Sequence, residues 1–93
     1  MEFEWDPAKT ATNRRKHGVS FEEAMTVFDD SCAIERFDPT HSSGEDRYVT
    51  LGTSERVRVL FVVHTLRHGD TIRIISARKA TSGEANEYAQ AQG

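Results

Sequence analysis

The order of hydrophobic and polar positions divides the chain into a helical first third and a strand-rich remainder. Near the N-terminus, the alternation in "EFEW", residues 2–5, predicts a short edge strand. Asp6 and the proline after it are typical of a helix start, and this helix is expected to end at Gly18. A second helix is expected next, because Ser20 and Glu23 form a capping-box pattern ahead of apolar residues at helical spacing.

From Cys32 onward the hydrophobic period changes to two, which is typical of strands. Four strands are expected, and the short connections between them predict an antiparallel meander. They are "CAIERF" (32–37), "RYVTLG" (47–52), "RVRVLFVVHTL" (56–66) and "TIRIISARK" (71–79). Thr81 and Glu84 form a second capping-box pattern, which predicts a C-terminal helix.

The predicted fold class is therefore α+β. We expect an antiparallel β-sheet meander with two N-terminal helices on one face and a C-terminal helix, in the order β-α-α-β-β-β-β-α. The two early helices are expected to cover the apolar face of the longest strand. The residues expected to be largely buried are Phe21, Phe28, Val57, Val59, Phe61 and Val63.

The opposite face of the longest strand is expected to be only partly covered. It carries Arg58 and His64 and, if the register holds, Arg73 from the neighbouring strand. A bulge near Ser76 would move side chains to the other face of the sheet, so the register in this region stays open.

Length and composition favour one domain, spanning residues 1–93. Cys32 is the only cysteine, so no internal disulfide is possible and a reducing compartment fits. The acidic first residues do not resemble a signal peptide, and the longest apolar run, 59–63, is too short to span a membrane. We expect a cytoplasmic protein with no membrane partner.

The net charge of −3 hides an asymmetry along the chain. Residues 1–46 carry 11 acidic side chains and 5 Lys or Arg, a net charge of −6, whereas residues 47–93 carry 4 and 7, a net charge of +3. This pattern is typical either of a basic working face on an acidic body or of an ordinary dipolar surface.

The candidate chemistry is that of basic side chains near strand ends. The four histidines lack metal-ligand spacing and no cofactor fingerprint is present, so no cofactor is expected. An arginine fork suits phosphate, and the helix start after Lys79 could add N–H donors for an anion. Alternatively, Arg78 forms a structural ion pair with Glu84 or Glu45. The basic residues are Arg47, Arg58, Arg73, Arg78 and Lys79.

Two further motifs have a functional and a structural interpretation. In "RRKHG", residues 14–18, His17 could titrate near neutral pH, or the cations could simply complement the helix dipole. In "GEDR", residues 44–47, carboxylates lie beside Arg47, an arrangement that is most often a solvated ion pair.

Taken together, several segments resemble the BrnT family, toxins of bacterial type II toxin–antitoxin systems. The resemblance covers about residues 3–88 and departs mildly from the family pattern at His64 and Gly83. It rests on "FEWDPAKTATNRRKHGVSFEEA", "VFDD", "GEDRYVTLG", "RVLFVVHT" and "RIISARKAT" followed by Glu84 and Tyr88.

The resemblance implies a RelE-like fold and a metal-independent endoribonuclease that cleaves RNA and arrests translation and growth. It also implies neutralisation by a BrnA-like ribbon-helix-helix antitoxin in a two-to-two complex. Operator DNA would then be contacted only through the antitoxin.

The resemblance also assigns candidate roles to individual side chains. Arg73 and Arg78 become the preferred phosphate binders, with Arg47 as a third. The acid, base or RNA-positioning groups are Lys16 and His17, and Glu45 is either a base or a partner that orients Arg47. The side chains expected to hold the RNA backbone are Arg58 and Lys79.

Two other functions remain open on the sequence. The chain could be a non-catalytic α+β module that docks a DNA-binding partner, or a small metal-dependent nuclease that loses its activity in EDTA. Expression of the chain alone separates the ribonuclease from the docking module, because only the ribonuclease arrests growth and degrades RNA.

Overall fold

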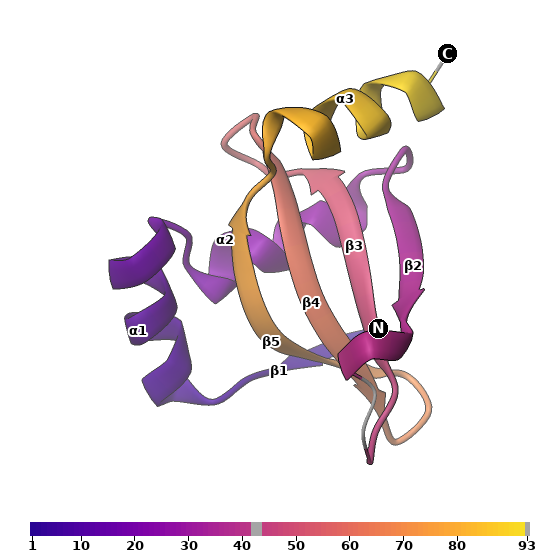
Figure 1. Cartoon of the computed structure of the whole chain (residues 1–93). Coiled ribbons are helices and arrows are strands. Elements are labelled where there is room, and N and C mark those ends of the chain that lie inside the picture. The colour runs from indigo at the N-terminus through magenta and orange to yellow at the C-terminus, as the bar shows by residue number, and fades with distance from the viewer. Residues whose placement is uncertain (42–43, 93) are drawn as a thin grey trace.

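A computed structural model describes residues 1–41 and 44–92 as a five-stranded sheet with helices packed around it (Figure 1). The sheet has the order β1-β5-β4-β3-β2. In chain order the elements are β1 (Glu2–Glu4), α1 (Pro7–His17), α2 (Phe21–Met25), the 3-10 helix η1 (Thr26–Asp29), β2 (Ile34–Asp38), the 3-10 helix η2 (Pro39–His41), β3 (Arg47–Thr53), β4 (Val59–Arg67), β5 (Thr71–Lys79) and α3 (Ser82–Ala91).

The predicted α+β class and element order are confirmed, and the meander describes β2 to β5. Those four strands pair antiparallel, whereas β1 pairs with β5 in parallel, so the sheet is mixed. In Figure 1, α2 lies behind the sheet, α1 lies beside β5, and α3 lies at the end of the sheet where β5 finishes. No helix in the described part of the chain has the length and apolar character needed to cross a membrane.

The helix ends follow from local side-chain chemistry. Asp6 Oδ1 accepts a hydrogen bond from the Ala8 N–H at 2.9 Å, and Gly18 closes α1 with φ 70°, a conformation that favours glycine. The capping box of α3 is complete. The box of α2 is only half formed, because the Ser20 hydroxyl accepts from the Glu23 N–H while the Glu23 carboxylate binds elsewhere. α2 spans five residues, and η1 follows it directly.

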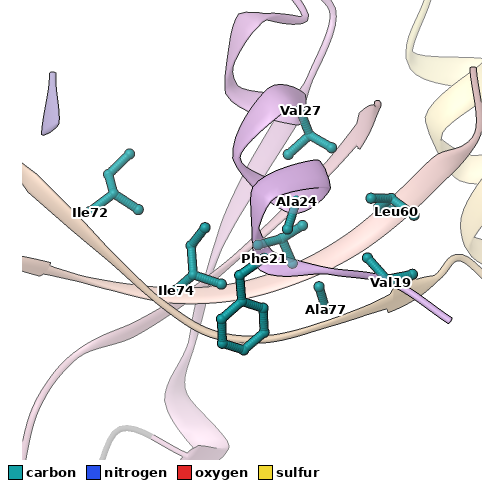
Figure 2. Close-up of a cluster of buried hydrophobic side chains, with 9 residues drawn as sticks. Val19, Phe21, Ala24, Val27, Leu60, Ile72, Ile74 and Ala77 are labelled. Carbon is teal, nitrogen blue, oxygen red and sulfur yellow. The ribbon is translucent and has the colours of Figure 1, made fainter. Parts of the chain in front are cut away.

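The hydrophobic core lies between α2 and one face of the sheet (Figure 2). Side chains from α2 and η1 enter it from one side, and side chains from β4 and β5 enter it from the other. The buried members are Val19, Phe21, Ala24, Val27, Leu60, Val62, Ile72, Ile74 and Ala77.

The face predicted for β4 was wrong. Leu60 and Val62 point into the core, whereas Val59, Phe61 and Val63 are half-buried on the opposite face. Both faces of this strand are apolar, so its own pattern could not decide between them.

Val57 and Phe28 also differ from the burial predicted for them, because both are less buried than expected. Val57 is 83% exposed in the turn between β3 and β4, where its φ of 60° is unusual for a β-branched residue. Phe21 is fully buried as predicted, and Phe28 is partly buried against the core.

A β-bulge in β5 sets which side chains reach each face. The pairing with β4 passes from Val63–Ser76 to His64–Ile74, which leaves Ile75 as an extra residue. The bulge lets Ile74 and Ala77 enter the same core although they are an odd number of residues apart.

His64 is a buried packing residue that is neutral at pH 7. Its Nε2 lies 2.8 Å from Thr50 Oγ1, and the Phe28 ring packs edge-on against it at 5.0 Å. Burial lowers the pKa of His64 from 6.5 to about 4. The nearest carboxylate, Glu35 Oε2, lies 4.0 Å from Nε2 and is on an exposed side chain.

Stability is therefore expected to fall as the pH drops through the range between these two pKa values. The unfolded chain binds a proton on His64 near pH 6.5, whereas the folded chain resists it until about pH 4. Between pH 7 and pH 5 the free energy of unfolding should decrease by about 2 kcal/mol. Urea unfolding at several pH values measures this, and His64→Phe should flatten the profile. An equally steep profile in the variant would contradict the assignment.

Candidate functional site

The last turn of α1 is fixed beside the end of β5 by one buried amide. β1 pairs with β5 only as far as Arg73, so the outer edge of β5 has no strand partner at Ala77 among the described residues. Asn13 takes that place: its Nδ2 donates to the Ala77 carbonyl at 2.7 Å, and its Oδ1 accepts from the Ala77 N–H at 3.2 Å. The same Nδ2 donates to the Val19 carbonyl at 2.8 Å.

The hydrogen bonds between Asn13 and Ala77 bring the ends of two elements together, and these ends carry motifs that are about 60 residues apart in the sequence. Lys16 and His17 are exposed in the last turn of α1, together with two arginines, and Arg78 and Lys79 end β5. We call this group, Arg14 to His17 with Arg78 and Lys79, the basic end. Sequence reasoning missed Asn13, although an asparagine inside a helix is a weak helix former and signals a local role.

Arg58 is also near the basic end, but its fork is occupied by a buried carboxylate. Its Nε and Nη2 donate to Glu23 at 2.8 and 2.6 Å, and Nη2 also donates to the Gly18 carbonyl at 2.8 Å. The hydrogen bond from Arg58 outweighs burial and lowers the pKa of Glu23, whose side chain is 4% exposed. Arg58 thus joins α2 to the start of β4 from the side that the helices cover.

Arg78 lies on the opposite face and contacts Glu84, the Phe61 ring and the Lys79 carbonyl. Its Nη1 and Nη2 donate to the two carboxylate oxygens of Glu84 at 2.7 and 2.9 Å. Its guanidinium lies 3.9 Å from the centre of the Phe61 ring, a cation–π contact. The hydrogen bonds from Arg78 lower the pKa of Glu84 to about 2. The ion pair considered as the structural alternative is therefore present, while Lys79 is exposed.

The remaining candidates lie toward the other end of the sheet. Arg73 donates to Glu4 of β1 at 2.6 Å, and Glu45 pairs with Arg67 at 3.4 Å. Arg47 begins β3 and is half-buried. Four residues of β5 lie between Arg73 and Arg78, which places their Cα atoms roughly 15 Å apart along the strand. The two guanidinium groups are held by different carboxylates, Glu4 and Glu84.

A small hollow separates α3 from β2 and β3. Its volume is about 240 Å³, and its floor includes Val49, Leu51 and Phe61. An ion pair between Arg36 and Glu87 lies at its rim. The hollow is smaller than most small-molecule sites.

α3 itself has no buried side chain and is held mainly by polar contacts. The Tyr88 hydroxyl donates to Asp30 Oδ2 at 2.5 Å and accepts from the Thr53 hydroxyl at 3.1 Å. Within residues 1–41 and 44–92, His, Cys, Asp and Glu side chains do not form a group of three that could hold a metal ion.

Arg58→Ala should destabilise the fold, because it leaves the buried Glu23 carboxylate without its charged partner. The free energy of unfolding is expected to fall by about 3 kcal/mol, measured by chemical denaturation. The matched control is Arg56→Ala, an exposed arginine in the same turn, which should change the free energy by less than about 0.5 kcal/mol. Equal stability of the two variants would show that the Arg58–Glu23 pair contributes little to folding.

Comparisons with known proteins place this arrangement among characterised folds. The sequence profile described as "Ribonuclease toxin, BrnT, of type II toxin-antitoxin system" matches residues 5–84. No curated protein matches the sequence. Among solved structures, the crystal structure of the Brucella abortus ribonuclease toxin, BrnT, superposes with a TM-score of 0.65 and 24% sequence identity. The match covers 88% of this chain and 99% of that one, and it shows a shared fold.

Proposed function

Because the chain belongs to the BrnT family of ribonuclease toxins of type II toxin–antitoxin systems, we propose that it arrests translation and growth by metal-independent RNA cleavage at the basic end. The observation that carries this proposal is the clamp of Asn13 on Ala77. It joins the last turn of α1 to the end of β5 and so concentrates cations within an acidic chain. Such a concentration of positive charge suits a polyanion.

The proposed reaction is attack by the RNA 2′-oxygen on the adjacent phosphorus, with departure of the 5′-oxygen. This chemistry needs a base for the 2′-hydroxyl, cations for the charge that develops on the phosphoryl oxygens, and an acid for the leaving oxygen. We assign the charge stabilisation to Arg78 and a backbone contact to Lys79. Lys16 and His17, at the same end, are the candidates for acid and base.

We propose that the RNA continues from the phosphate at Arg78 along β5 toward Arg73. Because the bulge turns Arg73 and Arg78 to the same face, one strand of RNA could meet both through different phosphates. Arg47 and Glu45 would serve that farther stretch. Arg58 has no place in this path, since it lies on the side of the sheet that the helices cover and its Nε and Nη2 donate to the buried Glu23 carboxylate.

Arg78→Ala should lower the rate of RNA cleavage by about 10²–10³ and abolish growth arrest, because it removes a preorganised donor to the developing charge. Arg78→Lys should also be impaired, since a point charge does not replace a fork. The loss of the partly exposed pair with Glu84 should cost at most about 1 kcal/mol of stability. Cleavage and thermal unfolding are measured on the same purified proteins, in buffer containing EDTA.

The matched control is Arg56→Ala, which removes an exposed arginine outside the proposed RNA path and should leave cleavage unchanged. A stable Arg78→Ala protein with full activity would refute the assigned role. Wild-type cleavage that is absent in the buffer containing EDTA and present in a parallel assay without EDTA would refute metal independence. A wild-type chain that neither arrests growth nor degrades RNA would favour the non-catalytic docking module.

We further propose that the partner is a BrnA-like ribbon-helix-helix antitoxin that covers the basic end or wraps around the domain in the cytoplasm. Ribbon-helix-helix proteins pair as symmetric dimers, so each dimer should carry two toxin chains. Operator DNA would be contacted through the antitoxin alone.

Light scattering of the purified complex should therefore give the mass of a two-to-two assembly. A one-to-one mass at micromolar concentration would contradict this stoichiometry. The chain mass of 10.5 kDa is the reference for counting toxin chains in the complex.

A further inference from the structure

Arg78 uses only part of its hydrogen-bonding capacity. A guanidinium carries five N–H donors in a fixed plane. Among the described residues, its hydrogen bonds use three of them: two from Nη1, to Glu84 and the Lys79 carbonyl, and one from Nη2, to Glu84. The Nε–H and the second Nη2–H remain. These two donors lie along one edge of the plane and form a second fork of the kind that binds phosphate with two parallel bonds.

The orientation of this second fork is fixed from two directions. The Glu84 carboxylate holds the end of the guanidinium, and the Phe61 ring lies against its flat face at 3.9 Å. Phe61 is also the cross-strand partner of Arg78, so the sheet itself sets the platform. The Arg78 side chain is 36% exposed, so a ligand can reach it from solvent.

We infer that Glu84 is a positioning residue, which holds the Arg78 guanidinium so that its Nε–Nη2 edge meets the scissile phosphate. This inference rests on the proposed ribonuclease function and adds a residue to it. A fork that is already oriented needs no rearrangement when charge develops on the phosphoryl oxygens. An arginine released from Glu84 keeps its charge but loses its fixed orientation.

The inference predicts opposite effects on binding and on chemistry. A carboxylate beside a phosphate is repulsive, so Glu84→Ala should leave KM unchanged or lower it. The same change should lower kcat by up to about 10²-fold, because small displacements of an aligned group are costly. If Glu84 instead only competed with RNA for Arg78, its removal would raise activity.

The experiment measures kcat and KM for RNA cleavage by Glu84→Ala and by its matched control, Thr81→Ala. Thr81→Ala removes the hydroxyl that accepts from the Glu84 N–H at 3.2 Å and weakens the start of α3. It leaves both Arg78–Glu84 hydrogen bonds in place, so its kcat should stay near that of the wild type. Glu84→Gln keeps an acceptor oxygen and should fall between the wild type and Glu84→Ala.

A double variant tests whether Glu84 acts through Arg78. Arg78→Ala/Glu84→Ala should cleave as slowly as Arg78→Ala alone, since no fork is left to orient. The inference is overturned if Glu84→Ala keeps the wild-type kcat, if Thr81→Ala loses as much, or if the double variant is much slower than Arg78→Ala. A wild-type chain without cleavage would overturn the proposed function, and the inference with it.

Discussion

The two-residue period of β5 is interrupted by one extra residue, and the arrangement of both sheet faces depends on that interruption. Without the bulge at Ile75, Ile74 and Ala77 could not both enter the core, and Arg73 and Arg78 would point to opposite faces. The core needs Ile74 and Ala77 on one face, and the proposed RNA path needs Arg73 and Arg78 together on the other. One inserted residue satisfies both, so the packing of the core and the proposed RNA path depend on the same backbone irregularity.

Two arginines outside the basic end are paired with carboxylates from the acidic half of the sequence. Glu4 reaches Arg73 and Glu23 reaches Arg58, so acids from the first half of the sequence lie against arginines of the second half. The asymmetry of charge along the sequence is therefore partly cancelled in space. The Arg73–Glu4 pair is partly exposed and adds little stability, whereas the Glu23 carboxylate is buried and depends on Arg58 for its charge partner. Both pairs also fix where an arginine side chain points.

Local sequence patterns were sufficient to predict the order of the helices and strands. They were insufficient to predict which faces of these elements pack together. The N-cap at Asp6, the C-cap at Gly18 and the capping box at Thr81 depend on neighbouring residues, so they were predictable. The side of β4 that is buried was not predictable, because both of its faces are apolar and the choice depends on α2. The convergence at the basic end depends on Asn13 meeting Ala77 across 64 residues, which no local pattern reports.

The polar attachment of α3 has a consequence for the dynamics of the molecule. A helix without a buried side chain contributes little to the cooperative unit that unfolds globally, so it belongs to the part of the molecule that opens first. Its backbone amides should exchange with solvent well before those of β4 and β5. Since Glu84 travels with this helix, warming would release the Arg78 guanidinium from its carboxylate partner while the sheet beneath it stays folded. The orientation of Arg78 would then be lost through the fraying of ten residues rather than through the melting of the core.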